Sequence, residues 1–239
     1  MKTLTYLIFS ICILIGCSSA LTHQTVKEGE ENTDTIETDT AKVMRLTEED
    51  YQRVADELNI EVATMKAVVE IEAGTAHEGF AAPGKPIVNF DATLFRRFTR
   101  KAGKSIGKTN RSTAFRKPDT RRHGTFGLAQ WARLESAREI NKSIAESATF
   151  WGMFQIGGFN WKLCGCQSLD EFVTRMCTSE AEQLEIFAVF IKNSKLLPYL
   201  QKKNWSKFAY RYNGPSYKSR GYDRKLRTAY AKHSKKSPK

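Results

Sequence analysis

Two glutamates at the end of an apolar segment, Glu70 and Glu72, are the first residues whose surroundings suggest chemistry. Residues 61–73 have the spacing of a helix, and Glu70 lies four residues after Lys66, which predicts a solvent-facing position. Glu72 lies four residues after Val68 and continues the apolar face. Burial at that edge would raise its pKa and let the carboxyl donate a proton near neutral pH, as cleavage of a glycosidic bond requires. The spacing by itself also fits an ordinary solvated glutamate at a helix end.

A second candidate is the run from Glu146 to Trp161, which reads Glu-Ser-Ala-Thr-Phe-Trp-Gly-Met-Phe-Gln-Ile-Gly-Gly-Phe-Asn-Trp. It combines three glycines and two tryptophans with two amide side chains, those of Gln155 and Asn160. Glycine weakens regular structure, so several glycines indicate places where the backbone approaches something closely. Aromatic rings beside amides suit a sugar, which has apolar faces and a rim of hydroxyls. The run therefore predicts a surface that contacts carbohydrate.

The same run carries a family resemblance. Residues 151–156 resemble the Trp-Gly-x-Phe-Gln-Ile signature of the bacterial and phage N-acetylmuramidase family, whose members have a lysozyme-like fold. Other blocks resemble the family in the same order, over roughly residues 46–232. They are Glu72-Ala73-Gly74, the segment from Val88 to Phe95, the segment from Gln130 to Leu134, Phe159-Asn160, and the segment from Phe208 to Pro215.

The resemblance implies a catalytic role for Glu72, because a helix in this family ends in a catalytic glutamate, as in goose-type lysozymes and lytic transglycosylases. Asp91 stands where the family has a second glutamate, and Thr93 stands where it has a histidine. The shorter acid leaves the role of Asp91 as a second catalytic carboxylate open.

The resemblance also implies binding residues. Gln155 and the Gly157–Gly158 backbone are expected to line the glycan cleft opposite Glu72, and Tyr212 and Asn213 to close the same wall. From the residues alone, Tyr212 also fits a buried hydroxyl, and Asn213 fits a turn before Gly214-Pro215. Trp151 and Trp161 are expected to support the core rather than to contact sugar.

Three functions agree with these residues. The first is a peptidoglycan hydrolase that cleaves the β-1,4 bond between N-acetylmuramic acid and N-acetylglucosamine. The second is a lytic transglycosylase, in which one glutamate acts as acid and then as base to give 1,6-anhydro ends. The third is a peptidoglycan-binding protein that has the fold and no activity, and the presence of Glu72 argues against it. None of these functions implies a cofactor.

The N-terminus predicts export. Met1-Lys2 precedes an apolar run from Leu4 to Gly16 that is too short for a comfortable membrane span. Leu14-Ile15-Gly16-Cys17 fits a lipobox, so residues 1–16 are predicted to be a lipoprotein signal peptide and Cys17 the lipidated residue, with an ordinary signal peptide as the alternative. Several acyl chains would anchor the protein stably. The expected location is the outer membrane facing the periplasm, with the cell surface as the alternative, and an exported protein has no nucleic-acid partner.

Charge divides the chain. Residues 17–42 are acidic and nearly free of apolar side chains, which predicts a disordered tether before a domain over residues 43–239. Residues 1–42 contain three lysines and six acids, so with an overall charge of +12 the remaining residues carry +15. A strongly basic exported domain implies an anionic partner, such as peptidoglycan. The basic stretch 100–125 is expected to be a long surface loop, either solvated or gripping anionic substrate.

The fold class follows from helical spacing over most of the domain, with little strand signal. We predict a mainly α, lysozyme-like helical domain with at most a small β element. The predicted helices cover about 47–58, 61–73, 91–100, 128–140, 168–176, 179–194, 205–212 and 222–232, with one short extended piece at 87–90.

The cysteines Cys164, Cys166 and Cys177 fit either one disulfide or three free thiols, and they match no common zinc pattern. No metal site is predicted, and the sequence does not indicate an oligomeric state.

Overall fold

The computed structural model describes residues 45–73, 78–106 and 114–235. The predicted signal peptide, Cys17 and the tether lie outside these residues, as do Gly74 and the middle of the basic stretch. Within the described ranges, every helix is too short or too polar to cross a membrane.

The described chain is mainly helical with two small antiparallel sheets, so the predicted fold class is confirmed. The long elements run in the order α2 (Glu48–Leu58), α3 (Val62–Glu72), α4 (Ala92–Lys101), α7 (Phe126–Ser147), α8 (Leu169–Met176), α9 (Glu180–Asn193), α11 (Trp205–Asn213) and α12 (Tyr222–Ser234). The short elements are β1 (Phe80–Ala82), β2 (Lys85–Pro86), β3 (Val88–Phe90), α6 (Thr120–His123), β4 (Thr149–Trp151), β5 (Ile156–Gly157), η1 (Gly158–Asn160), α10 (Leu197–Gln201) and η2 (Pro215–Tyr217).

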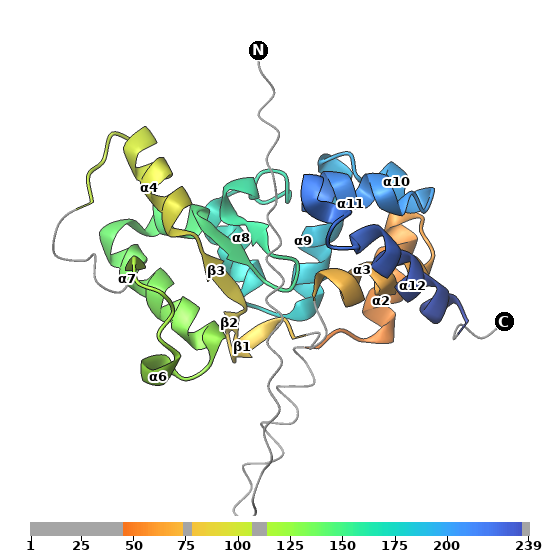
Figure 1. Cartoon of the computed structure of the whole chain (residues 1–239), viewed down its shortest axis with the longest axis horizontal. Helices are drawn as coiled ribbons and strands as arrows, with labels where there is room; N and C mark the ends of the chain where they lie inside the picture. Colours follow the sequence, from red (N-terminus) through yellow and green to blue (C-terminus); the bar gives the residue numbers. More distant parts are fainter. Residues whose placement is uncertain (1–44, 74–77, 107–113, 236–239) are drawn as a thin grey trace, which may run out of the picture.

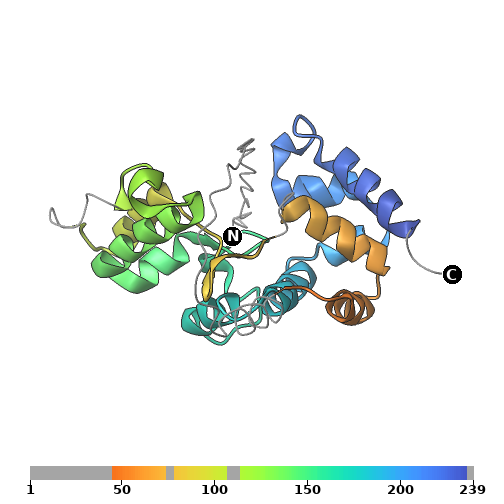
Figure 2. The ribbon, with the colours of Figure 1, turned by 90° about the horizontal axis from the view of Figure 1, so that it is seen from below.

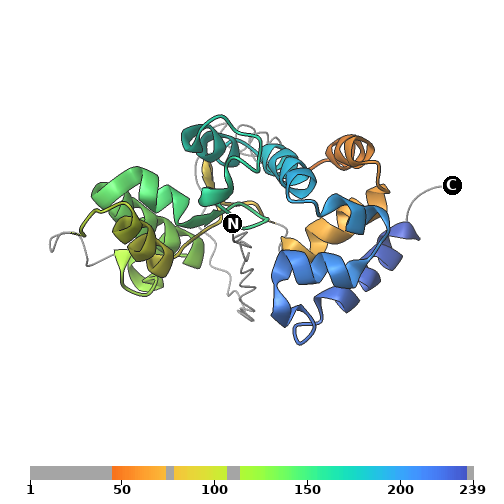
Figure 3. The same cartoon turned by 90° about the horizontal axis from the view of Figure 1, so that it is seen from above.

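The helices form two groups (Figure 1). One group contains α4, α6 and α7, and the other contains α2, α3, α10, α11 and α12. Helices α8 and α9 and the strands lie between them, and the views from below and from above show the two groups standing apart on either side of this middle part (Figures 2 and 3). The chain crosses from the second group to the first after α3 and returns through α9.

Helix α3 is the central element of its group. The helix before it, α2, begins with a capping box, in which Thr47 accepts from the Asp50 amide and the Asp50 carboxylate accepts from the Thr47 amide. Helix α3 is apolar on most of its circumference, and it packs against both α2 and α12. A helix that is apolar nearly all round is buried in a core, so this packing explains how its last residue, Glu72, comes to be buried.

The glycine-rich run folds as a β-hairpin, which the sequence did not predict beyond a small β element. Strand β4 pairs with β5, with Phe150 opposite Gly157, and its other edge pairs with β3, with Asn89 opposite Phe150. The order β3-β4-β5 therefore places the predicted extended piece beside the hairpin. Gly152 has a φ of +69° and opens the turn of the hairpin, a conformation that favours glycine.

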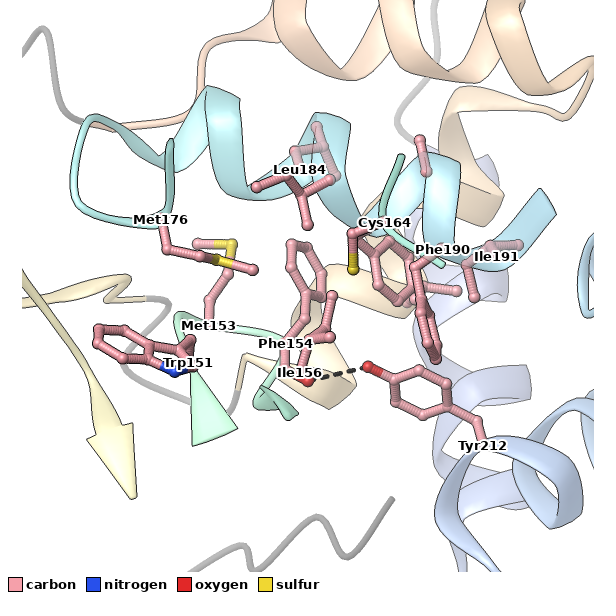
Figure 4. Packing of buried hydrophobic residues seen from close by; sticks show 14 of the residues in the cluster. Trp151, Met153, Phe154, Ile156, Cys164, Met176, Leu184, Phe190, Ile191 and Tyr212 are labelled. Carbon is pink, nitrogen blue, oxygen red and sulfur yellow. Dashed lines mark hydrogen bonds between the residues drawn. The ribbon is translucent and has the colours of Figure 1, made fainter. Parts of the chain in front are cut away.

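The hairpin packs its apolar side chains against α9 (Figure 4). Phe154 stacks on Phe187 of α9 with ring centroids 4.1 Å apart. Trp151 is fully buried and meets Trp131 of α7 edge to face, so its expected role as a core residue is confirmed. Trp161 is partly buried and packs against the same core.

Gly158 makes the closest backbone approach in the hairpin region. A Cβ at this position would lie 2.2 Å from the carbonyl oxygen of Glu146, at the end of α7. The same oxygen accepts a hydrogen bond from the Trp151 indole at 3.0 Å, which holds it in place. Gly157 and Gly158 are both buried. The glycines therefore allow close packing within the protein, and the expectation that their backbone lines a cleft stays a prediction.

We expect Gly158→Ala to lower the free energy of unfolding by about 3 kcal/mol or more, because the added methyl meets fixed backbone rather than a flexible side chain. Gly84→Ala is the control, since its added methyl meets nothing within 4 Å although its φ is +66°. A left-handed alanine costs about 1 kcal/mol. Urea unfolding of both variants checks the difference, and equal losses would contradict the packing explanation.

The structure differs from the sequence prediction in several elements. The predicted end of a helix at Ile140 coincides with a break, because Asn141 has non-helical angles and its side chain caps a continuation to Ser147. The short helices α6 and α10 were not predicted, and α6 lies inside the stretch expected to be a loop. Cys164, Cys166 and Cys177 are free, which answers the open question about a disulfide.

Candidate functional site

Glu72 is a buried carboxyl at the end of α3, with 5% of its surface exposed. Its Oε1 accepts a hydrogen bond of 3.0 Å from the Asn213 amide nitrogen, at the end of α11. The two residues are 141 positions apart in the chain, and both side chains are buried. The predicted burial of Glu72 is confirmed, and its direct partner is a residue that the sequence had placed on the same site.

Burial raises the pKa of Glu72 to about 7, because a charged carboxylate is poorly solvated there. The hydrogen bond from Asn213 acts in the opposite direction, since it stabilises the charged form. Within the described part of the chain, Glu72 forms no ion pair. The carboxyl is therefore protonated at mildly acidic pH and remains partly protonated at neutral pH.

The second oxygen of Glu72, Oε2, is buried and has no hydrogen-bond partner among the described residues. Because Oε1 accepts from the Asn213 amide, the acidic proton belongs on Oε2. A buried polar atom without a partner is uncommon and requires an explanation. The described residues supply no acceptor for the proton on Oε2.

Tyr212 precedes Asn213 in the last turn of α11 and holds that turn against the hairpin. Its side chain is fully buried, and its hydroxyl donates to the Phe154 carbonyl at 2.9 Å (Figure 4). Burial raises the pKa of Tyr212 well above its usual value, so the hydroxyl stays protonated and keeps donating. Tyr212 therefore links the hairpin to α11, the helix on which Asn213 lies. Its buried side chain is not accessible to a substrate.

Gln155 follows Phe154 and closes the hairpin turn. It has a φ of +48°, a left-handed conformation that is uncommon for residues other than glycine. Its side-chain amide donates to the Gly152 carbonyl at 2.9 Å, which stabilises the turn. Strained backbone of this kind is concentrated at functional sites. The hydrogen bond from Tyr212 to Phe154 joins the chain neighbours of Asn213 and Gln155, and Asn213 in turn binds Glu72.

Asp91 lies apart from these contacts. It is the N-cap of α4, where its Oδ1 accepts from the Thr93 amide at 2.8 Å and the Leu94 amide at 2.9 Å. Its own amide donates to the Ala148 carbonyl next to the hairpin. No contact among the described residues joins Asp91 to Glu72 or Asn213, so the structure gives it a structural task and leaves a catalytic one as a prediction.

A buried side chain that was not predicted, that of Gln183, positions the hairpin. Gln183 of α9 accepts from the Met153 amide at 2.8 Å and donates to the Met176 carbonyl at 3.0 Å. The glycines that face it leave little room, because a Cβ on Gly152 would lie 2.6 Å from its Oε1. The sequence signal was present: Gln183 lies four residues before Phe187, and it is a polar residue on an apolar stripe.

Glu146 is a second buried carboxylate, with 1% of its surface exposed. Burial raises its pKa, and the Arg138 guanidinium at 2.9 Å acts against this shift. Lys142 lies 3.9 Å from its other oxygen. Unlike Glu72, this carboxyl is paired with a guanidinium that favours its charged form, which leaves Glu72 as the better candidate for acid chemistry. The described residues contain no group of three histidine, cysteine or acidic side chains that could hold a metal ion.

The chain is similar to known proteins in sequence and in structure. The sequence pattern of a family described as Muramidase, N-acetylmuramidase, matches residues 61–234, which include Glu72 and Asn213. A crystal structure of an endolysin from the Burkholderia phage AP3 is similar to the chain at 37% sequence identity and a TM-score of 0.68, over 80% of this chain and 72% of that one. No curated protein shows significant similarity.

Proposed function

Because the chain belongs to the N-acetylmuramidase family, and is thus a glycoside hydrolase that acts on peptidoglycan, we propose that Glu72 is the general acid of its reaction. The bond cleaved would be the β-1,4 bond between N-acetylmuramic acid and N-acetylglucosamine. The glycosidic oxygen would be the acceptor that Oε2 lacks. Asn213 would hold the carboxyl from the other side.

The observation that supports this assignment is the state of the Glu72 carboxyl. It is buried, its pKa is raised to about 7, and its Oε2 has no partner among the described residues. A general acid works best when its pKa lies near the working pH, because it is then protonated and still releases the proton readily. The same properties weigh against a protein that only binds peptidoglycan. In such a protein a buried carboxyl without a partner would lower stability and serve no reaction.

The second step of hydrolysis requires a water molecule that attacks the anomeric carbon. We infer that Asp91 or the Gln155 amide positions this water. Asp91 is the only one of the two with a carboxylate, and its Oδ1 already caps α4. Gln155 lies on the turn that Tyr212 ties to the Asn213 helix end.

Because the Asp91 carboxylate already caps α4, a reaction that needs no second carboxylate is favoured as the alternative. That reaction is the one of a lytic transglycosylase. In that reaction Glu72 would protonate the leaving oxygen and then accept a proton from the muramic 6-hydroxyl, which attacks the anomeric carbon in place of water. The product would be a 1,6-anhydro end that is lighter by one water than the hydrolytic end. Mass spectrometry of purified peptidoglycan digested by the protein separates the two. Reducing muramic ends would support the hydrolase, and anhydro ends would refute it.

The hydrogen bond between Asn213 and Glu72 predicts a change in the pH profile. We expect Asn213→Ala to raise the pKa of Glu72 further, because the bond that lowers it is removed. The basic limb of kcat/KM, which lies near pH 7 in the parent protein, would then move to higher pH. Lys207→Ala on the exposed face of α11 is the control and should leave the limb in place. A limb that stays or moves to lower pH would contradict the assignment.

We also propose that Cys17 is lipidated after removal of residues 1–16, and that the acidic segment 17–42 holds the domain over residues 43–239 away from the membrane. The proposal rests on the lipobox and on the composition of the segment. Expression of the full chain and of Cys17→Ser, followed by membrane fractionation, tests it. Equal membrane association of the two proteins would refute lipidation, and the sorting of the parent protein would show whether the outer membrane is its location.

A further inference from the structure

The described part of the basic stretch forms a pocket with α7. The pocket has a volume of about 420 Å³ and is lined by residues 116–123, Ala129 and Arg133, which we call the arginine pocket. Its lining residues belong to α6, to α7 and to the segment before α6. Figure 1 shows α6 and α7 on the other side of β3 from α3, the helix that ends at Glu72. The proposed reaction does not use the arginine pocket.

The arginine pocket carries a large excess of positive charge. Arg116, Lys117, Arg121, Arg122 and Arg133 line it, and its one acid is Asp119. The Asp119 carboxylate caps α6 by accepting from a backbone amide at 3.1 Å. Among the residues that the structure describes, no carboxylate forms an ion pair with any of these five cations. A concave surface with this balance attracts an anionic ligand.

Arg133 connects the pocket to the sheet. Its Nη1 donates to the Phe90 carbonyl at 3.1 Å and to the Gln130 side chain at 2.8 Å, and its guanidinium lies 5.3 Å from the centre of the Phe90 ring. Its Nε is buried without a partner among the described residues. Burial lowers the pKa of Arg133, and Asp91 acts against this shift. A fixed, partly buried arginine therefore forms the inner wall of the pocket, next to the strand that pairs with the hairpin.

We propose that the arginine pocket binds the free carboxylates of a peptide stem of peptidoglycan. This inference rests on the proposed function, because the stems are attached to the same glycan strand that would be cleaved. Arginine suits the task, since its planar fork matches a carboxylate with two parallel hydrogen bonds. The stem would belong to a muramic acid unit away from the cleaved bond, because the pocket and Glu72 lie in different helix groups.

The experiment uses soluble glycan strands without attached phosphate polymers, either with their stems or after removal of the stems by an amidase. The pocket variant is Arg121→Gln with Arg122→Gln, two exposed residues of α6. The control is Arg224→Gln with Arg227→Gln, two exposed residues of α12 in the other helix group. Both variants lose two positive charges. The dissociation constant and kcat/KM are measured for each protein on each strand.

We expect the pocket variant to lose about tenfold in affinity and in kcat/KM on stem-bearing strands, the effect of losing charge-assisted hydrogen bonds. On stem-free strands it should match the parent within about twofold, and the control should match on both. No loss on stem-bearing strands overturns the proposal, as does an equal loss on both forms. A third substrate, strands that keep their phosphate polymers, tests the other anion: a loss on this substrate alone overturns the proposal and assigns the pocket to phosphate.

The binding measurement separates this inference from the proposed function. If the parent protein binds stem-bearing strands more tightly through Arg121 and Arg122 but cleaves neither form, the pocket assignment stands and the reaction does not. If it cleaves both forms and the pocket variant is unaffected, the reaction stands and the pocket assignment does not.

Discussion

Glu72→Gln is expected to lower kcat on purified peptidoglycan by roughly a thousandfold, with little change in KM. Glutamine keeps the size of the side chain and can still accept from Asn213 through its carbonyl oxygen, so substrate binding should persist. It cannot donate an acidic proton from the position of Oε2, and general acid catalysis typically contributes about 10²- to 10⁴-fold. The release of soluble fragments from sacculi measures the loss.

Glu70→Gln is the matched control, because Glu70 lies two residues earlier on the same helix and has different partners. Its carboxylate pairs with Lys232 at 2.8 Å and His233 at 2.9 Å, both on α12. We expect the activity of this variant to stay within about twofold of the parent, since surface ion pairs contribute little. If Glu72→Gln clears cell walls as fast as the parent, the assignment of the general acid is wrong.

Helical spacing predicted that Glu72 continues the apolar face of its helix, although the spacing also fitted a solvated glutamate at a helix end. Its position four residues after Val68 gave the apolar face, and the burial that follows raises the pKa of its carboxyl. The same reasoning predicted the ends of α8 and α9 within one residue. These features depend on contacts within one element, which the sequence displays directly.

Other parts of the site depend on contacts between distant elements. The bond from Asn213 to Glu72 requires α11 to end beside α3, and no local pattern fixes that meeting. The sequence left Tyr212 as either a cleft residue or a buried hydroxyl. Only the tertiary packing determines that its hydroxyl donates to the Phe154 carbonyl. The glycines of the hairpin signalled a close approach correctly, but the neighbour of Gly158 is the Glu146 carbonyl rather than a sugar.

The burial that prepares Glu72 as an acid also predicts a cost in stability that depends on pH. The pKa of its carboxyl is about 7 in the folded protein, against an ordinary value of 4.5 in the unfolded chain. Below pH 4.5 the carboxyl is neutral in both states. Between pH 4.5 and pH 7 the unfolded state loses the proton first, so the folded state binds more protons and the free energy of unfolding falls as pH rises. Above pH 7 both states are ionised and the fall stops.

The size of the effect follows from the pKa difference. Each unit corresponds to about 1.4 kcal/mol, so Glu72 should lower the free energy of unfolding by about 3 kcal/mol between pH 4 and pH 8. Glu72→Gln has no charge to bury and lacks this fall. Relative to the parent, the variant should therefore become more stable by about 3 kcal/mol over the same interval. Urea unfolding of both proteins at the two pH values measures it, and differences in packing cancel because they are present at both.

Glu70→Gln should show the opposite sign in the same experiment. Burial acts to raise the pKa of Glu70, but its bonds to Lys232 and His233 outweigh burial and lower it. A carboxylate with a lowered pKa stabilises the fold above its unfolded pKa, and that stability is lost as pH falls. Removing it should therefore make the variant less stable relative to the parent at pH 8 than at pH 4. If Glu72→Gln gave no gain at pH 8, its carboxyl would not be the buried, raised-pKa group that acid catalysis at this position requires.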